Sequence, residues 1–155
     1  MRVEILFLGK TKESYLEAGI NDYVSRLSHY IKLEIKTVKE GRINKNEPEK
    51  AIIEKQSRNL LKHVHGAYLV CLDRTGKQLE SMALASQLEK WEMGGPPKIS
   101  FVIGGPLGLS KEILQKADLV LSLSRMTFTH EMARMLLLEQ LYRACTIKAG
   151  EKYHK

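Results

Sequence analysis

The sequence predicts an α/β fold in which a largely parallel sheet is covered by helices on both faces. Its 155 residues match the size of one domain, and a domain of this size buries roughly 70% of its unfolded surface without disulfides or metals. Apolar runs of strand length alternate with helical patterns from one end of the chain to the other. Five such runs with helices between them are typical of a parallel sheet. We therefore expect residues 1–155 to form one domain.

The first half of the chain is expected to contain two strands, two helices and a loop. The stretch 39–47 lacks apolar periodicity, which predicts a mobile loop. Pro48 suits the first position of a helix because its fixed φ is already helical. The expected elements are a strand at Val3–Leu8, a helix at Ser14–Leu27, a strand at Leu33–Val38 and a helix from Pro48 to about Lys62.

The second half repeats this alternation with three strands and three helices. Ser81 and Ser110 are placed to cap helices, because serine hydroxyls accept hydrogen bonds from the free amides of a first turn. The expected strands are Ala67–Asp73, Ile99–Ile103 and Leu119–Leu123, and the expected helices run from Ser81, from Ser110 to about Ala117, and over Glu131–Thr146.

The last of these helices carries apolar residues on two flanks instead of one. At 100° per residue, one flank holds Ala133, Leu137, Leu141 and Cys145, and the other holds Met132, Met135, Leu136 and Tyr142. Two apolar flanks need two packing partners. They fit a helix at the centre of one domain, or a helix that packs on the sheet on one side and on a second subunit on the other.

The net charge of +7 is spread along the chain. Residues 1–70 hold 13 basic and 9 acidic side chains, and residues 71–155 hold 12 and 9. This distribution fits RNA binding and a merely soluble basic surface equally well. Cys71 and Cys145 lie among apolar neighbours without a partner motif, which predicts reduced thiols. No signal peptide or membrane span is recognisable, so we expect a cytoplasmic protein with no membrane partner.

Several familiar chemistries lack their motifs. The segment His130–Arg134 begins like the helix of a zinc protease, but Arg134 stands where the second histidine is needed. The chain also lacks the glycine-rich cradles for dinucleotides and nucleotide phosphates, and no elbow motif presents a nucleophile. We expect no metal cofactor.

Three loops remain as candidates for a ligand site, because ligands of open α/β sheets bind at the carboxyl ends of strands. They begin at Leu72, Gly104 and Leu123. Gly104 and Gly105 let another molecule approach the backbone, although Gly-Gly-Pro turns also serve purely structural purposes. The loop Leu123–Phe128 mixes hydroxyl and apolar side chains, which fits a pocket wall as well as an ordinary turn.

The chain ends in Tyr153, His154 and Lys155. Terminal residues are commonly just solvated. A histidine, a phenol and a cation would nevertheless suit proton handling and phosphate contact if this tail docks against the rest of the protein.

Three motifs can now be compared with known families: VIGGPLGLS at Val102–Ser110, LSLSRMTFTHEMARMLLLEQLYRA at Leu121–Ala144, and the ending YHK at Tyr153–Lys155. Together they resemble the ribosomal RNA large subunit methyltransferase H family, a branch of the SPOUT methyltransferases. The resemblance covers the whole chain. It implies a SPOUT-type, largely parallel sheet flanked by helices, with a deep trefoil knot near the carboxyl end, an exception to the rule that chains do not thread their own loops.

The resemblance also implies a cofactor and a substrate. S-adenosyl-L-methionine would be held in the knot, mainly by backbone groups, and the reaction would transfer its methyl group to N3 of a pseudouridine in 23S ribosomal RNA, with the assembled ribosome as the expected substrate. The cofactor-binding positions that it implies are Leu72, Gly104, Leu123, Ser124, Arg125, Met126, Thr127 and Phe128.

The family works as a homodimer in which the tail of one subunit reaches over the cofactor of the other. On this basis His154 is expected to accept the proton or position the imide, and Tyr153 and Lys155 to hold the base and the RNA backbone. His130 and Arg134 are second candidates, because they follow the third cofactor loop.

The chain has no appended RNA-binding domain, so the catalytic body itself must bind the ribosomal RNA. Lys39, Arg42 and Lys45 in the expected loop are candidate phosphate contacts. Two other functions fit the same residues: a non-enzymatic RNA-binding or assembly factor with this fold, and a small nucleotide-binding α/β enzyme. Binding of S-adenosylmethionine would separate the methyltransferase from the other two.

Overall fold

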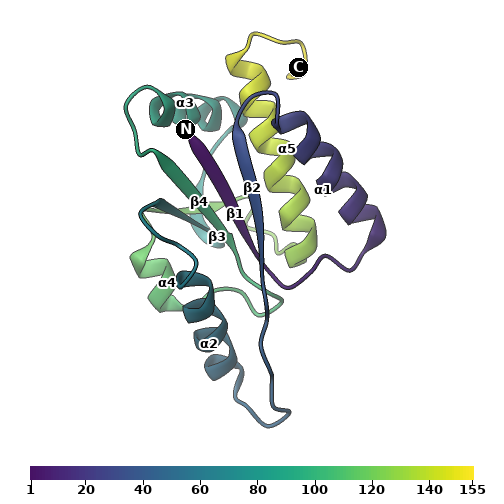
Figure 1. The fold of residues 1–155 in the computed structure, drawn as a ribbon, viewed down its shortest axis with the longest axis vertical. Coiled ribbons are helices and arrows are strands. Elements are labelled where there is room, and N and C mark those ends of the chain that lie inside the picture. The colour runs from purple at the N-terminus through teal and green to yellow at the C-terminus, as the bar shows by residue number, and fades with distance from the viewer.

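A computed structural model describes all 155 residues, which form a five-stranded parallel sheet with helices on both faces (Figure 1). The strand order is β2-β1-β4-β3-β5. The strands are β1 (Arg2–Leu8), β2 (Lys32–Val38), β3 (Tyr68–Gln78), β4 (Lys98–Ile103) and β5 (Leu119–Ser122), and the helices are α1 (Ser14–Leu27), α2 (Glu49–Leu61), α3 (Ser81–Glu92), α4 (Lys111–Lys116) and α5 (His130–Lys148). The expected parallel α/β architecture is confirmed.

The central strand β1 separates two apolar layers. Its side chains alternate, so that Val3, Ile5 and Phe7 join one buried cluster while Leu6 and Leu8 join the other. The larger cluster lies under α1, α3 and α5, and the smaller one lies under α2 and α4 (Figure 1). Burying each of these large side chains contributes about 1.5–3 kcal/mol, which is why β1 has no solvent-exposed face over most of its length.

The helix starts test the capping predictions. Ser110 caps α4 as expected, because its Oγ accepts a hydrogen bond from the Ile113 amide at 3.3 Å. The prediction that Ser81 caps α3 is wrong. Ser81 lies inside the first turn, and its Oγ donates to Oε1 of Gln140 on α5 at 2.7 Å instead. Pro48 occupies the N-cap position of α2, immediately before its first helical residue.

Strand β3 is longer than the sequence indicates. It continues past Asp73 to Gln78, with a register shift between Leu72 and Lys77 in its pairing with β5. The residues 74–78 are mostly polar, so no apolar alternation marks them as a strand, and only Lys77 and Gln78 among them pair with the edge strand β5.

Helix α5 lies between α1 and α3 and packs across the sheet (Figure 1). Its fully buried residues include Leu137 and Leu141, as one of the two apolar flanks predicts. On the other flank, Met135 packs against Gly19 of α1 and Tyr142 stacks on Tyr23 with a centroid distance of 6.0 Å. The central-helix interpretation therefore accounts for part of the second flank within one chain.

Two other sequence predictions concern topology and the membrane. No helix is long and apolar enough to cross a bilayer. The trefoil knot stays a prediction, because the order of strands in a sheet does not define how the connecting loops thread.

Glu4 is a fully buried carboxylate at the centre of the sheet. It accepts a hydrogen bond from Lys36 Nζ at 2.7 Å, forms an ion pair with Lys98 Nζ at 2.9 Å and accepts a hydrogen bond from Ser100 Oγ. Burial alone would raise the pKa of Glu4, but the bonds from Lys36, Lys98 and Ser100 outweigh it and hold this pKa below its usual value. The ionised carboxylate therefore stabilises the folded state.

Replacing Glu4 with Gln is expected to lower the free energy of unfolding at pH 7 by about 2 kcal/mol, because the two lysines lose their buried anion. The Glu4 pKa is lower in the folded than in the unfolded chain, so its contribution is present above about pH 4.3 and is lost as the pH falls through the folded value. Urea unfolding at pH 7 and pH 3 measures both effects.

The matched control is Glu34→Gln, an exposed carboxylate beside Glu4 in register on β2, which is expected to change stability by less than about 0.5 kcal/mol. A Glu4→Gln deficit that is equally large at pH 3 and pH 7 would contradict the assignment.

Candidate functional site

The carboxyl edge of the sheet holds a cavity of about 820 Å³. All three loops that the sequence singled out open into it, with Leu72 after the first part of β3, Gly104 after β4 and Leu123 after β5. Parallel strands end at one edge, so residues more than 50 positions apart along the chain meet around a single space. Of the predicted cofactor positions, the cavity is lined by Leu72, Gly104, Leu123, Ser124, Met126, Thr127 and Phe128.

The loop after β4 is a tight turn that requires glycine at positions 104 and 108. The Gly108 amide donates to the Gly105 carbonyl at 3.0 Å, and Gly108 has a φ of +83°. A Cβ on Gly104 would lie 2.7 Å from the carbonyl oxygen of Gly108. The glycines therefore allow the turn to close on itself, and Gly104, Gly105 and Gly108 all line the cavity.

The loop after β5 has a backbone held by serine hydroxyl groups, and its apolar side chains lie beside the cavity. Ser124 Oγ accepts a hydrogen bond from the Met126 amide at 3.0 Å, and Ser122 Oγ donates to the Ser124 carbonyl at 3.0 Å. The side chains of Met126 and Phe128 line the cavity although they are 76% and 39% exposed. Arg125 is exposed and does not line the cavity.

The register shift in β3 forms another part of the rim. Asp73 accepts hydrogen bonds from the amide of Thr75 at 2.9 Å and from its hydroxyl, which turns the chain over the carboxyl edge. A Cβ on Gly76 would lie 2.5 Å from the carbonyl oxygen of Val120, so this return against β5 also needs glycine. Asp73 and Arg74 consequently line the cavity.

A fourth wall comes from the β1–α1 connection, which no motif in the sequence indicated. Glu131 accepts hydrogen bonds from the amides of Lys12 at 2.6 Å and Glu13 at 3.0 Å, and it has a lowered pKa because these bonds outweigh the effect of its burial. Glu13, Tyr15 and Leu16 then line the cavity.

Arg134 supports this wall from behind and does not line the cavity. Its guanidinium donates to the Leu8 carbonyl at 2.7 Å and to Thr11 Oγ1 at 2.9 Å, and it lies 4.6 Å from the ring centroid of Phe7. The side chain is fully buried. The structure therefore places Arg134 where it positions the β1–α1 connection.

His130 is the histidine that the structure brings to the cavity. Burial and then the charge of Arg134 hold the pKa of His130 below its usual value, so the imidazole is neutral at pH 7. A neutral imidazole is able to accept a proton, which is the state that a general base requires.

The tail lies elsewhere in the same chain. The Tyr153 hydroxyl donates to Glu139 Oε1 at 3.1 Å, and its ring packs edge-on against Tyr142 at 4.8 Å. Glu139 is nine residues along α5 from His130, or about 13 Å along the helix axis. His154 is exposed. One chain therefore does not bring Tyr153 or His154 to the cavity.

The next feature is the arrangement of side chains that could bind a metal ion. No group of three or more histidine, cysteine, aspartate or glutamate side chains gathers in a way that could hold a metal ion. Cys71 and Cys145 are buried free thiols, and burial raises the pKa of each, to about 12 and about 11.

Comparisons with known proteins agree with this architecture. A family profile described as "Predicted SPOUT methyltransferase" matches residues 1–154. Proteins called ribosomal RNA large subunit methyltransferase H are similar over the full length of both chains, with 50% identity in Desulfotalea psychrophila and 46% in Syntrophobacter fumaroxidans.

A solved structure, described as a probable methylase family protein from Haemophilus influenzae, shares the fold with a TM-score of 0.53 and 14% identity. The likeness covers 97% of this chain and 67% of that one. The match of the family profile to almost every residue, together with relatives that are about half identical over their whole length, places this chain in a family: it belongs to the SPOUT methyltransferases.

Proposed function

We propose that this protein is an S-adenosyl-L-methionine-dependent methyltransferase that methylates N3 of a pseudouridine in 23S ribosomal RNA. Family membership supports methyl transfer, and the names of the full-length relatives support ribosomal RNA as the substrate. The observation that carries the proposal is the cavity at the carboxyl edge, where the loops after β3, β4 and β5 converge.

The residues around this cavity fit the cofactor. Apolar side chains such as Leu72 and Leu123 provide a surface for an adenine ring, and the backbone groups of Gly104 and Gly105, which line the cavity, are available for hydrogen bonds. The carboxylates of Glu13 and Asp73 at the rim add negative charge, which suits a cationic sulfonium. When bound, the cofactor supplies an activated methyl group, and the chain holds it for an in-line attack.

The nucleophile must lose a proton, since N3 of a pseudouridine carries one. His130 is one acceptor within the subunit, because it lines the cavity and is neutral at pH 7. His154 is the other, but its own chain holds it away from the cavity. We therefore propose a homodimer in which the tail of one subunit completes the site of the other, with His154 of the partner subunit near the base.

The remaining assignments follow from the same proposal. Residues 1–155 act as one domain in the cytoplasm, with the cofactor loops forming the trefoil knot. Lys39, Arg42 and Lys45 lie exposed on the connection between β2 and α2, where they are free to contact phosphates.

Radiolabelled methyl transfer tests the activity directly. The purified protein is expected to bind S-adenosylmethionine in calorimetry and to label ribosomes, with free large subunits and naked 23S RNA compared in parallel. Cofactor binding without labelling of any substrate would favour a non-enzymatic RNA-binding factor. No binding at millimolar cofactor would contradict the proposal.

Replacing Gly104 with Ala is expected to weaken S-adenosylmethionine binding at least tenfold, because the new Cβ would collide with the Gly108 carbonyl and move the loop after β4. Gly105→Ala is the matched comparison, since its Cβ would meet no backbone atom but only side-chain atoms, Leu8 Cδ2 at 3.0 Å and Gln56 Oε1 at 3.7 Å. Calorimetry measures both affinities. Equal losses for the two variants would show that loop geometry at Gly104 is not the cause.

Complementation between two defective subunits tests the composite site. A subunit lacking residues 153–155 keeps the cofactor loops, and a Gly104→Ala subunit keeps the tail. Each homodimer is expected to have little activity, whereas each mixed dimer formed on co-expression holds one complete site out of two, which is about one quarter of all sites if the chains pair at random. If the mixed dimers recover no activity, the tail and the cofactor loops of a working site come from the same chain, and the composite site is wrong.

A further inference from the structure

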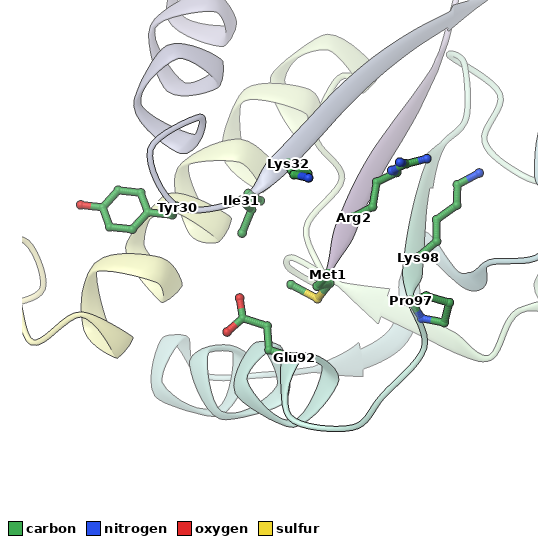
Figure 2. A pocket seen from close by; sticks show the side chains of 8 residues that line it. All are labelled: Met1, Arg2, Tyr30, Ile31, Lys32, Glu92, Pro97 and Lys98. Atoms are coloured by element: carbon green, nitrogen blue, oxygen red, sulfur yellow. The ribbon is translucent and has the colours of Figure 1, made fainter.

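Three cations lie side by side at the amino edge of the sheet, opposite the cavity that binds the cofactor in the proposed function. Arg2 is in register with Lys32 of β2 on one side and with Lys98 of β4 on the other. Figure 2 shows Arg2 between the two lysines, with all three near the start of their strands. With strands about 4.8 Å apart, the three backbone positions span about 10 Å. We name Lys32, Arg2 and Lys98 the amino-edge row.

This part of the sheet has no apolar side chain for a helix to cover. On the face toward α2 and α4, the positions Leu6, Leu8 and Val102 near the carboxyl ends form the apolar cluster. The same face carries the row at the amino ends, followed one position inward by Glu34, Glu4 and Ser100. Arg2 and Lys32 are exposed, and they border a hollow of about 620 Å³. The amino-edge row therefore does not contribute to the hydrophobic core.

The charges of the row are incompletely neutralised within the chain. Lys98 pairs with the buried Glu4, whereas Arg2 and Lys32 form no salt bridge. Glu92, the one carboxylate on the hollow, is paired with Lys148 of α5. The row therefore presents two free cations and a third that a buried carboxylate holds in place, which is an arrangement suited to a phosphate backbone.

The tail lies at the same end of the molecule as the row. Tyr30 borders the hollow, and its hydroxyl donates to Glu151 of the tail at 2.7 Å. Both chain ends lie at this end in Figure 1. An RNA that meets the tail of a subunit therefore also lies within reach of that subunit's row.

We propose that the amino-edge row is a ribosomal RNA contact, which binds phosphates next to the base that the tail meets. The proposal rests on the proposed function, because it is the tail's contact with a target base that brings the RNA to this edge. On this proposal, residues at the amino ends of the strands supply part of the affinity for the RNA, although the cofactor loops lie at the carboxyl ends.

The test compares the wild type with the double variant Arg2→Gln/Lys32→Gln in binding to purified large ribosomal subunits between 50 and 200 mM salt. Removing two phosphate contacts is expected to weaken binding about tenfold and to reduce the slope of log K against log salt by about 1.4–1.8. KM for the ribosomal substrate is expected to rise by a similar factor, while kcat and the affinity for S-adenosylmethionine stay unchanged.

The matched control is Lys90→Gln, which removes an exposed lysine from α3 on the other face of the sheet. Lys98 is not replaced, because its loss would also remove one of the cations that pair with the buried Glu4 carboxylate. A double variant with the same salt slope as the wild type and Lys90→Gln would overturn the proposal. Failure of the wild type to methylate any ribosomal substrate would instead overturn the proposed function, and the slopes would still report whether the row binds RNA.

Discussion

The buried guanidinium of Arg134 joins the first strand to the last helix, and the shape of the cavity depends on it. A fully buried cation is costly unless its donors are used, and two of the three guanidinium nitrogens of Arg134 donate to Leu8 and Thr11 while Nε has no partner and the guanidinium carbon lies 4.6 Å from the Phe7 ring centroid. One turn earlier, Glu131 holds the two amides that follow Thr11. The two side chains together fix the β1–α1 connection, so the start of the chain becomes a wall of a site that its carboxyl half mostly builds.

The parallel sheet divides the molecule into two chemically different edges. At the carboxyl edge, strand ends place glycines, hydroxyls and apolar side chains around one cavity. At the amino edge, the starts of β2, β1 and β4 place three cations in a row, and the tail docks nearby through Tyr30. Because one chain holds these edges apart, a site that needs both a cofactor cavity and a tail requires a second chain. The separation of the two edges within one chain is the structural reason for proposing a composite site between two subunits.

The sequence predicts those features that depend on local patterns. The five strands, the order of loops along the chain and the cap at Ser110 all follow from periodicity and residue type. It does not predict features that tertiary contacts create. The continuation of β3 to Gln78 depends on pairing with β5, and Ser81 leaves its capping role for Gln140 of α5. Glu131 was invisible as a cavity residue because its partners are backbone amides about 120 positions away, which no motif encodes.

The end of the tail is held on its own helix α5 by a few contacts, most of them made by Tyr153. Tyr153 makes two hydroxyl contacts, with Glu139 at 3.1 Å and with Tyr23 at 3.4 Å, and its ring meets Tyr142 and the Arg143 guanidinium. These four contacts contribute about 1 kcal/mol each, whereas ordering the five backbone residues after Gly150 costs about 1–2 kcal/mol per residue. The contacts of Tyr153 therefore offset only part of the cost of ordering the tail. Tyr153 is therefore weakly held on its own helix, while the hydrogen bond between Tyr30 and Glu151 keeps the base of the tail beside the amino-edge row.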